Sequence, residues 1–514
     1  MSWSRRRVLS GLAAAPWALA WAGPTGCAVG TEQRPPRTPR GVEVALPSIV
    51  HGSLAAGPGL YLVEDHGLPL VAVAVAVAAG HRHERPGEEG RASLATALLL
   101  EGMEGGDRVA LLERYGELGT TPTASAGPSQ VVVRCTVHRD DAPAALQLLL
   151  DNLRRPTSDS EAFERVRREQ REAMRAVQGE PEVVAGLGLV LGSHGVDPPS
   201  ATFAGGTAES IDAATLEQVH AWLPPRLRLD GLTFMMAGDV DQAQALRWID
   251  AAIEGWPPAQ GPRPVSPPPL EAIPEPARPR VVLVRWPEQP QAIMALGGPR
   301  EPLGHAAEPA QALADALMAG MMQYELRSRQ RISYGIQSRS WTTKVGAVEQ
   351  LWAKLEPGEV GRAVQALWSY LERLEGEVVL RDEPVDEVRR AAMVGLMHDF
   401  HGAESSLGQL RGMVEHGLSG PAPVERFRRL QALRTDEVTA ALRHVYRPDR
   451  VRLCVVGDDA VIERARAVLP DDGVVVRTPA QLLGLPEGTA TPARAPGPAE
   501  VCVARALGPQ IMIR

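Results

Sequence analysis

Two short histidine clusters are the residues of this 514-residue sequence best suited to metal chemistry. His81 and His83 lie beside Glu84 directly after an apolar run, and two imidazoles with a carboxylate could bind a metal ion there. His398 and His401 are spaced one helical turn apart, but no glutamate lies between them. Since neither H-x-x-E-H nor H-E-x-x-H occurs anywhere in the sequence, we favour ordinary exposed residues over a metal site for both clusters.

The cysteines and the net charge exclude other kinds of chemistry. Cys135 and Cys454 lie in strand-like apolar runs, which is typical of inert core residues. No two cysteines form a C-x-x-C pair, which argues against a zinc ribbon or a thioredoxin-type site. The formal net charge of -8 argues against nucleic acid as the main partner, because phosphate binding favours a basic surface.

The first 27 residues resemble an export signal. A basic stretch around Arg5 and Arg6 precedes a weakly apolar run that is too short and too poor in leucine to span a membrane. The doubled arginine resembles a twin-arginine signal. Two processing routes stay open: cleavage after Ala22, or lipidation of Cys27, where Pro24 replaces the usual leucine. Residues 28–41 are rich in proline and arginine and are predicted to be a tether.

A proline-rich linker divides the rest of the chain near its middle. Residues 257–279 contain ten prolines, so this segment cannot form a helix and is predicted to be an extended spacer. The halves on either side, 42–256 and 280–480, follow one plan, and the final residues 481–514 are predicted to be a flexible tail.

Each half is predicted to contain two opening strands, a helix, an amphipathic helix and a closing strand. The first opening strands pass through a Pro-containing turn to a second strand that ends at glycine, Gly80 or Gly298. The closing strands end in Gly238-Asp239 and Gly457-Asp458, separated by one repeat length. The matching segments are 59–63 and 280–284, 70–79 and 292–296, 91–103 and 308–326, and 141–153 and 359–374. We therefore predict two homologous domains of one α+β fold.

An ordered series of short motifs points to a known family. The segments are Gly80-His-Arg-His-Glu84, Gly90 to Gly102, Phe163 to Glu172, Gly205-Gly206-Thr207 and Ala237-Gly238-Asp239, followed in the second half by Leu326 to Tyr334. In this order they resemble the pitrilysin/insulinase family of zinc metallopeptidases over roughly residues 42–480. The resemblance implies two metallopeptidase-like domains, each an antiparallel-rich sheet with packed helices.

The resemblance also implies that the zinc site is lost. Active members carry H-x-x-E-H on the helix that here begins near Gly90, with two zinc-binding histidines and a general-base glutamate. Those three positions fall on Ser93, Ala97 and Thr96, and the distant third ligand falls near Glu172. Serine, alanine and threonine cannot replace these groups, so we expect no catalytic residue and no zinc cofactor in this chain.

Arg327 and Tyr334 match the family's Arg…Tyr segment. In family members this pair contacts the substrate, and an Arg cation and a Tyr hydroxyl suit a polarised peptide carbonyl. An ordinary surface arginine and strand tyrosine remain an open alternative.

The resemblance implies a substrate-binding or regulatory subunit of an exported heterodimeric zinc peptidase, whose partner subunit carries the zinc and whose substrate is a peptide. One alternative is a stand-alone peptide-binding envelope lipoprotein, and another is an active metallopeptidase with relocated ligands. The expected location is the periplasm or cell envelope, with membrane contact only through a lipid on Cys27.

Overall fold

The computed structural model describes residues 46–55, 57–196, 205–256, 278–287, 289–343, 345–376, 380–470 and 472–485, all within one compact unit that begins at Leu46. The predicted export signal, Cys27, the tether and residues 257–277 of the linker lie outside this range. Among the described residues, no helix is both long and apolar enough to cross a membrane.

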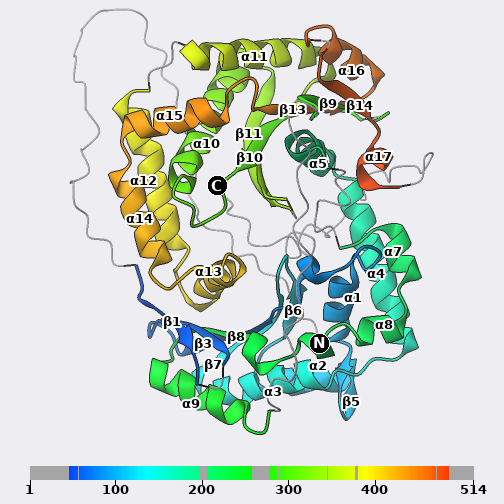
Figure 1. Cartoon of the computed structure of the whole chain (residues 1–514), viewed down its shortest axis with the longest axis vertical. Helices are drawn as coiled ribbons and strands as arrows, with labels where there is room; N and C mark the ends of the chain where they lie inside the picture. The colour runs from blue at the N-terminus through cyan, green and yellow to red at the C-terminus, as the bar shows by residue number, and fades with distance from the viewer. Residues whose placement is uncertain are drawn as a thin grey trace, which may run out of the picture. The chain divides into compact units, whose positions relative to one another are not determined.

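The first half of the chain forms a six-stranded sheet in the order β1-β2-β8-β3-β7-β6. Figure 1 labels β1, β3, β6, β7 and β8 of this sheet. Its central strand β3 (Leu70–Val77) alternates valine and alanine and is buried on both faces after its first residue. Such a continuous apolar run is what a strand covered on both faces requires. The other strands are β1 (Ile49–Ser53), β2 (Gly59–Glu64), β6 (Thr123–Ala126), β7 (Val131–His138) and β8 (Leu232–Gly238).

The second half repeats this plan. Its sheet has the order β11-β12-β10-β13-β9-β14. Taken from β9 towards β11, the strands β9, β13, β10, β12 and β11 match β2, β8, β3, β7 and β6 of the first sheet. In each set of five, only the first pair is parallel. The strands are β9 (Val281–Arg285), β10 (Ala292–Arg300), β11 (Ser333–Thr342), β12 (Ala347–Leu355), β13 (Arg452–Gly457) and β14 (Val474–Arg477). The predicted α+β fold with two homologous, mainly antiparallel sheets is thereby confirmed.

The strand register corrects one detail of the predicted repeat. Ala72 pairs with the residue before Gly238, and Ile293 pairs with the residue before Gly457, so Ala72 and Ile293 are equivalent. Gly298 therefore does not match Gly80. β10 continues through Gly298 to Arg300, whereas β3 ends three residues before Gly80. The prediction that both strands end at glycine was wrong, because Gly298 stays paired with β12.

The helices follow the predicted order with one clear difference. The predicted helix 91–103 ends early: α1 spans Arg91–Leu98, and Gly102–Met103 forms strand β4, which pairs with β5 (Gly106–Asp107). The remaining helices of the first half are α2 (Arg108–Glu117), α3 (Ala142–Arg154), α4 (Ser160–Gln178), α5 (Pro181–His194), α7 (Ala208–Ala213), α8 (Leu216–His220) and α9 (Gln242–Ala252).

In the second half, α10 (Glu308–Met322) passes directly into a π-helical segment (Gln323–Arg329). The predicted tail 481–514 is wrong at its start, because Gln481 and its neighbours lie in α17 (Pro479–Leu483), where Leu482 is buried. The other helices are α11 (Val360–Gly376), α12 (Asp382–His398), α13 (Ala403–Glu415), α14 (Ala422–Ala432), α15 (Thr435–Val445) and α16 (Asp459–Arg466).

Each sheet packs against one helix from the other half of the sequence. Helix α5 packs on β9, β10 and β13, and α13 packs on β2, β3 and β8. Helix α5 is buried from Glu182 to His194. A Cβ on its Gly186 would lie 2.4 Å from the Trp341 ring, and one on Gly188 would lie 2.5 Å from Cys454 Sγ. These glycines therefore let the helix approach the sheet closely.

Candidate functional site

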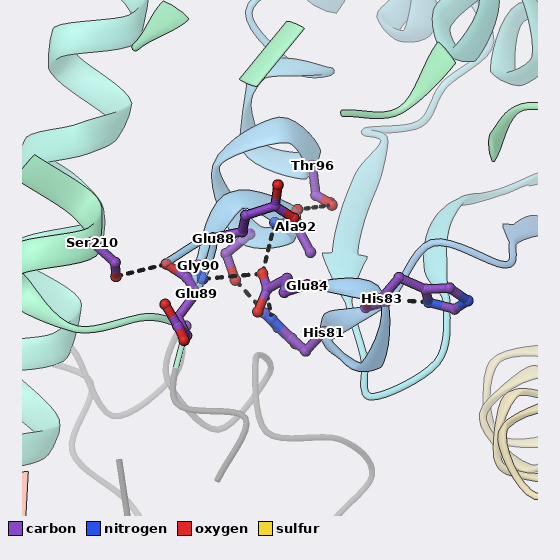
Figure 2. Close-up of polar contacts among 12 residues, drawn as sticks. His81, His83, Glu84, Glu88, Glu89, Gly90, Ala92, Thr96 and Ser210 are labelled. Atoms are coloured by element: carbon purple, nitrogen blue, oxygen red, sulfur yellow. Dashed lines mark hydrogen bonds and ion pairs between the residues drawn. The ribbon is translucent and has the colours of Figure 1, made fainter. Parts of the chain in front are cut away.

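A buried carboxylate organises the start of helix α1. Glu84 Oε1 accepts hydrogen bonds from the backbone N–H of Gly90 at 3.0 Å and of Ala92 at 2.9 Å. Gly90, the N-cap residue, has a left-handed backbone and no side chain to cap the helix. Glu84 is only 8% exposed and supplies the missing cap from six residues earlier (Figure 2).

His81 and His83 lie on a short 3-10 turn and are both buried, so the prediction of exposed side chains was wrong. His81 Nδ1 lies 3.2 Å from Glu84 Oε1, and its Nε2 lies 3.4 Å from Ser93 Oγ. His83 instead bonds through Nδ1 to the carbonyl oxygen of Gly80, and burial lowers its pKa. Figure 2 shows the two rings well apart, so they do not form a metal clamp.

The second histidine pair lies at the end of α12. His398 is the last residue of that helix and His401 follows it in a turn, and both side chains are exposed. Throughout the part of the chain that the structure describes, no group of three or more His, Cys, Asp or Glu side chains is placed to hold a metal ion.

The cysteine thiols are buried as predicted. Cys135 and Cys454 are free, and burial raises the pKa of Cys135 to about 12 and that of Cys454 further still. Because the thiolate is the reactive form, burial keeps both groups unreactive.

Arg327 and Tyr334 lie on a locally distorted segment that connects α10 to β11. Arg327 belongs to the π-helical segment, and Tyr334 is 78% exposed near the start of β11. Arg331 between them has φ 58°, the only positive φ of a non-glycine residue in the described ranges. The pairing of β11 with β12 shifts register between Ser333 and Ile336.

Hydrogen bonds hold this distorted segment together. The Gln323 side chain accepts from the backbone N–H of Ile336 at 2.9 Å, which ties the π-helical segment to the register shift. Burial acts to raise the pKa of Glu325, but hydrogen bonds from Gln330 and Arg329 outweigh it and lower the pKa. π-Helical turns, left-handed non-glycine residues and bulges each cost free energy and occur often at functional sites. The segment therefore displays Arg327 and Tyr334 from a fixed, strained backbone.

Comparison with protein-family models matches residues 61–187 to the insulinase (peptidase family M16) model and residues 213–391 to the peptidase M16 inactive-domain model. Together the two models cover more than half of the chain. The chain belongs to the insulinase family. A comparison with curated protein sequences gave no match.

Solved structures share the insulinase-family fold. A peptidase M16 inactive domain from Pseudomonas fluorescens aligns with TM-score 0.67 and 20% identity, over 80% of this chain and 98% of that one. A protease from Helicobacter pylori aligns with TM-score 0.67 and 14% identity, over 80% and 100%. The periplasmic protease PqqL from Escherichia coli aligns with TM-score 0.66 and 13% identity, over 81% of this chain but 46% of that one.

The residues predicted to take the family's motif positions, Ser93, Thr96 and Ala97, all lie on α1. Ser93 and Ala97, one turn apart, are half-buried on the same side of the helix. Thr96 is buried, and its hydroxyl donates to the Ala92 carbonyl oxygen at 2.6 Å. The hydroxyl of Thr96 is thus used inside the helix, and a threonine has no carboxylate to activate water.

Glu172, predicted near the third ligand position, is exposed on α4. Helix α4 packs against α1. Gln170 on this helix is half-buried, and its Nε2 donates to the carbonyl oxygen of Gly205 at 3.0 Å. A Cβ built on Gly205 would lie 2.3 Å from Gln170 Nε2 and 3.6 Å from Ser93 Oγ. Gln170 and Ser93 therefore both border Gly205, a grouping that sequence analysis missed because it depends on the rotation of α4.

Proposed function

We propose that this chain is an exported insulinase-family protein that does not cleave peptides with zinc by itself. In this proposal it serves as the substrate-binding or regulatory subunit of a heterodimeric peptidase whose partner subunit carries the zinc. The observation that carries the proposal is the contrast between the motif helix and the Arg327 segment. The first has no zinc-binding side chain at the family positions, and the second presents two polar side chains to solvent.

The side chains at the motif positions support the loss of zinc. In the predicted alignment Ser93 and Ala97 take the places of the two imidazoles, and Glu172 is exposed on α4. Zinc in proteins is held by several Cys, His or carboxylate ligands at once, so one glutamate cannot replace the set.

The Arg327 segment supports peptide binding. In the described part of the chain, the Arg327 side chain forms no hydrogen bond or ion pair, and Tyr334 is exposed. A guanidinium and a phenol hydroxyl are donors, and peptide carbonyl oxygens are their natural acceptors.

Export is supported by the sequence and by one neighbour. The basic and apolar leader precedes the described residues, and the similar fold of PqqL belongs to a periplasmic protease. Periplasmic or envelope location is part of the proposal, and lipidation at Cys27 would keep the chain at the membrane surface.

Zinc content tests the first half of the proposal. The mature protein, dialysed against trace zinc, is expected to contain close to no zinc by elemental analysis. An insulinase-family member with an intact H-x-x-E-H motif, treated in parallel, provides the positive control. About one zinc per chain, lost in a variant lacking His81 and His83 or one lacking His398 and His401, would instead support a relocated site.

Reconstitution tests the second half. The chain is mixed with an intact H-x-x-E-H family member from the same cell, and the complex is measured by sedimentation. We expect a one-to-one complex that cleaves peptides faster than the zinc subunit alone. Absence of binding to every active member from that cell would exclude the subunit role.

A further inference from the structure

At the N-terminal end of helix α1, a serine of the helix, a histidine of the preceding 3-10 turn and a glutamate between them in the sequence are linked by hydrogen bonds. Ser93 Oγ lies 3.4 Å from His81 Nε2, and His81 Nδ1 lies 3.2 Å from Glu84 Oε1. We propose that these residues form a hydrolytic triad for carboxylic esters, with Ser93 as nucleophile, His81 as general base and Glu84 as positioning residue. This activity goes beyond the proposed function, because it requires neither zinc nor a partner subunit.

The contacts of Glu84 determine which nitrogen of His81 carries the proton. Its Oε1 accepts from the backbone N–H groups of Gly90 and Ala92, so this oxygen is an acceptor and carries no hydrogen. The hydrogen shared with His81 therefore belongs to Nδ1. In the neutral ring, Nε2 then carries the lone pair, 3.4 Å from the Ser93 hydroxyl oxygen. This is the tautomer that a general base for serine requires.

Groups that could stabilise an oxyanion lie beside the serine. Among the described residues, the Ser93 backbone N–H in the first turn of α1 forms no hydrogen bond. Gln170 Nε2 has two hydrogens and uses one on the carbonyl oxygen of Gly205, next to Ser93. A Cβ on Gly205 would lie 3.6 Å from Ser93 Oγ and 2.3 Å from Gln170 Nε2, so the glycine lets the amide of Gln170 occupy the space beside Ser93.

The reaction follows from these positions. Ser93 Oγ attacks the acyl carbon while its proton moves to His81 Nε2. The bond from that carbon to the alcohol oxygen then breaks, and His81 gives its proton to the departing alcohol. Water attacks the acyl-Ser93 ester, passing a proton to His81, and the carboxylic acid and free Ser93 are released as His81 returns the proton.

Covalent labelling by an alkyl fluorophosphonate tests the proposal. The purified chain, treated with chelator and without any partner, is incubated with the probe and digested with trypsin. Ser93 is the only serine in the tryptic peptide 92–108, so mass spectrometry identifies its modification directly. We expect labelling at Ser93, none in Ser93→Ala, and at least about 100-fold slower labelling in His81→Ala.

Two comparisons separate catalysis from structure. Glu84→Gln keeps an oxygen that can accept from both backbone N–H groups, so a purely structural role predicts unchanged labelling, whereas the triad predicts slower labelling at an unchanged melting temperature. Ser158 Oγ lies 2.6 Å from His220 Nε2, but among the described residues no carboxylate contacts this histidine.

Ser158 is therefore the internal control, and we expect it to stay unlabelled. Labelling of Ser158 as fast as Ser93, unchanged labelling in His81→Ala, or no labelling of Ser93 would each overturn the proposal. Because zinc and partner are absent, these outcomes are independent of the subunit role.

Discussion

Helices α1 and α10 hold equivalent places in the two halves, since each follows the central strand of its sheet, yet they start and end differently. Helix α1 has eight residues and is capped by the buried carboxylate of Glu84. Helix α10 has fifteen residues, has no side-chain cap, and runs on into the π-helical segment that carries Arg327. The carboxylate at the start of α1 makes internal contacts, whereas Arg327 and Tyr334 after α10 are exposed to solvent.

The difference shows where a duplicated fold can diverge. The five matching strands keep their order and direction, because each contributes to a core that tolerates little change. The segments around α1 and α10 contact fewer strands than the sheet strands themselves do. They can therefore accept a carboxylate cap in one copy and a distorted backbone in the other. We therefore expect the chemistry of this molecule at these two helices. Three predictions test the contrast between them, and a fourth compares the helices that cover the two sheets.

The largest effect is expected at Glu84. Glu84→Ala leaves two buried backbone N–H groups and His81 without their acceptor, so the free energy of unfolding should fall by about 3 kcal/mol. Urea denaturation measures this change. Glu88→Ala is the matched control, because that carboxylate is only partly buried in an ion pair with Arg91, and its loss should cost about 0.5 kcal/mol. Equal losses in the two variants would show that Glu84 is not a special cap.

Elements that follow from a local apolar pattern are predicted better from the sequence than features that depend on contacts between distant residues. β2, β3, β8 and β13 fall within two residues of prediction, because buried strands read as continuous apolar runs. The end of α1 was missed because Leu98, Leu99 and Met103 are all buried, although Leu99 lies in a turn and Met103 in a strand. Apolar periodicity alone cannot distinguish a helix from a short hairpin of similar burial.

The candidate site was less predictable for two reasons. The burial of His81 depends on a 3-10 turn that brings Glu84 and Ser93 together, and no periodic pattern encodes such a turn. Gln170, which borders Ser93, lies two residues before the predicted Glu172, and two residues rotate a side chain by more than half a turn of a helix. The positive φ of Arg331 could not be predicted from its residue type, because glycine or asparagine would be expected at positive φ.

The second prediction concerns peptide binding by the exposed segment. Arg327→Ala and Tyr334→Phe should each weaken the binding of an unstructured peptide about 10-fold, or about 1.4 kcal/mol, because each removes one donor to a carbonyl oxygen. The melting temperature should not change, since both side chains are exposed. Fluorescence anisotropy measures the affinity. Tyr324→Phe is the matched control, because Tyr324 is 65% exposed on the same segment and should bind peptide like the wild type. A similar loss in all three variants would argue against a specific Arg/Tyr role.

The third prediction tests the strain in the same segment. Arg331→Gly should raise the free energy of unfolding by about 0.5 to 1 kcal/mol. Glycine adopts positive φ without steric cost, and the steric cost that arginine has there is larger than the extra chain entropy that glycine loses on folding. Arg329→Gly, at a position with ordinary φ in the π-helical segment, should lower stability. Chemical denaturation of both variants gives the sign. If Arg331→Gly is destabilising, the arginine side chain itself contributes contacts that outweigh the strain.

The fourth prediction concerns how the free energy of unfolding depends on pH, through the helices α5 and α13 that cover the two sheets. This effect vanishes at neutral pH. Burial lowers the pKa of His194, the last residue of α5, to about 4 from 6.5, and Arg278 adds to the shift. Between pH 6.5 and 4 the unfolded chain binds a proton that the folded chain does not, so His194 lowers the free energy of unfolding as the pH falls through this range. His194→Gln should remove this part of the acid sensitivity.

On the other sheet the sign is reversed. Burial raises the pKa of Glu415, the last residue of α13, so its contribution to stability is greatest at acid pH and is lost as the pH rises through the raised pKa. Glu415→Gln should therefore leave the acid sensitivity from His194 in place. Urea denaturation of both variants between pH 7 and pH 4.5 measures the difference. If the two variants respond alike, the docking of α5 and α13 is not distinguished by these terminal side chains.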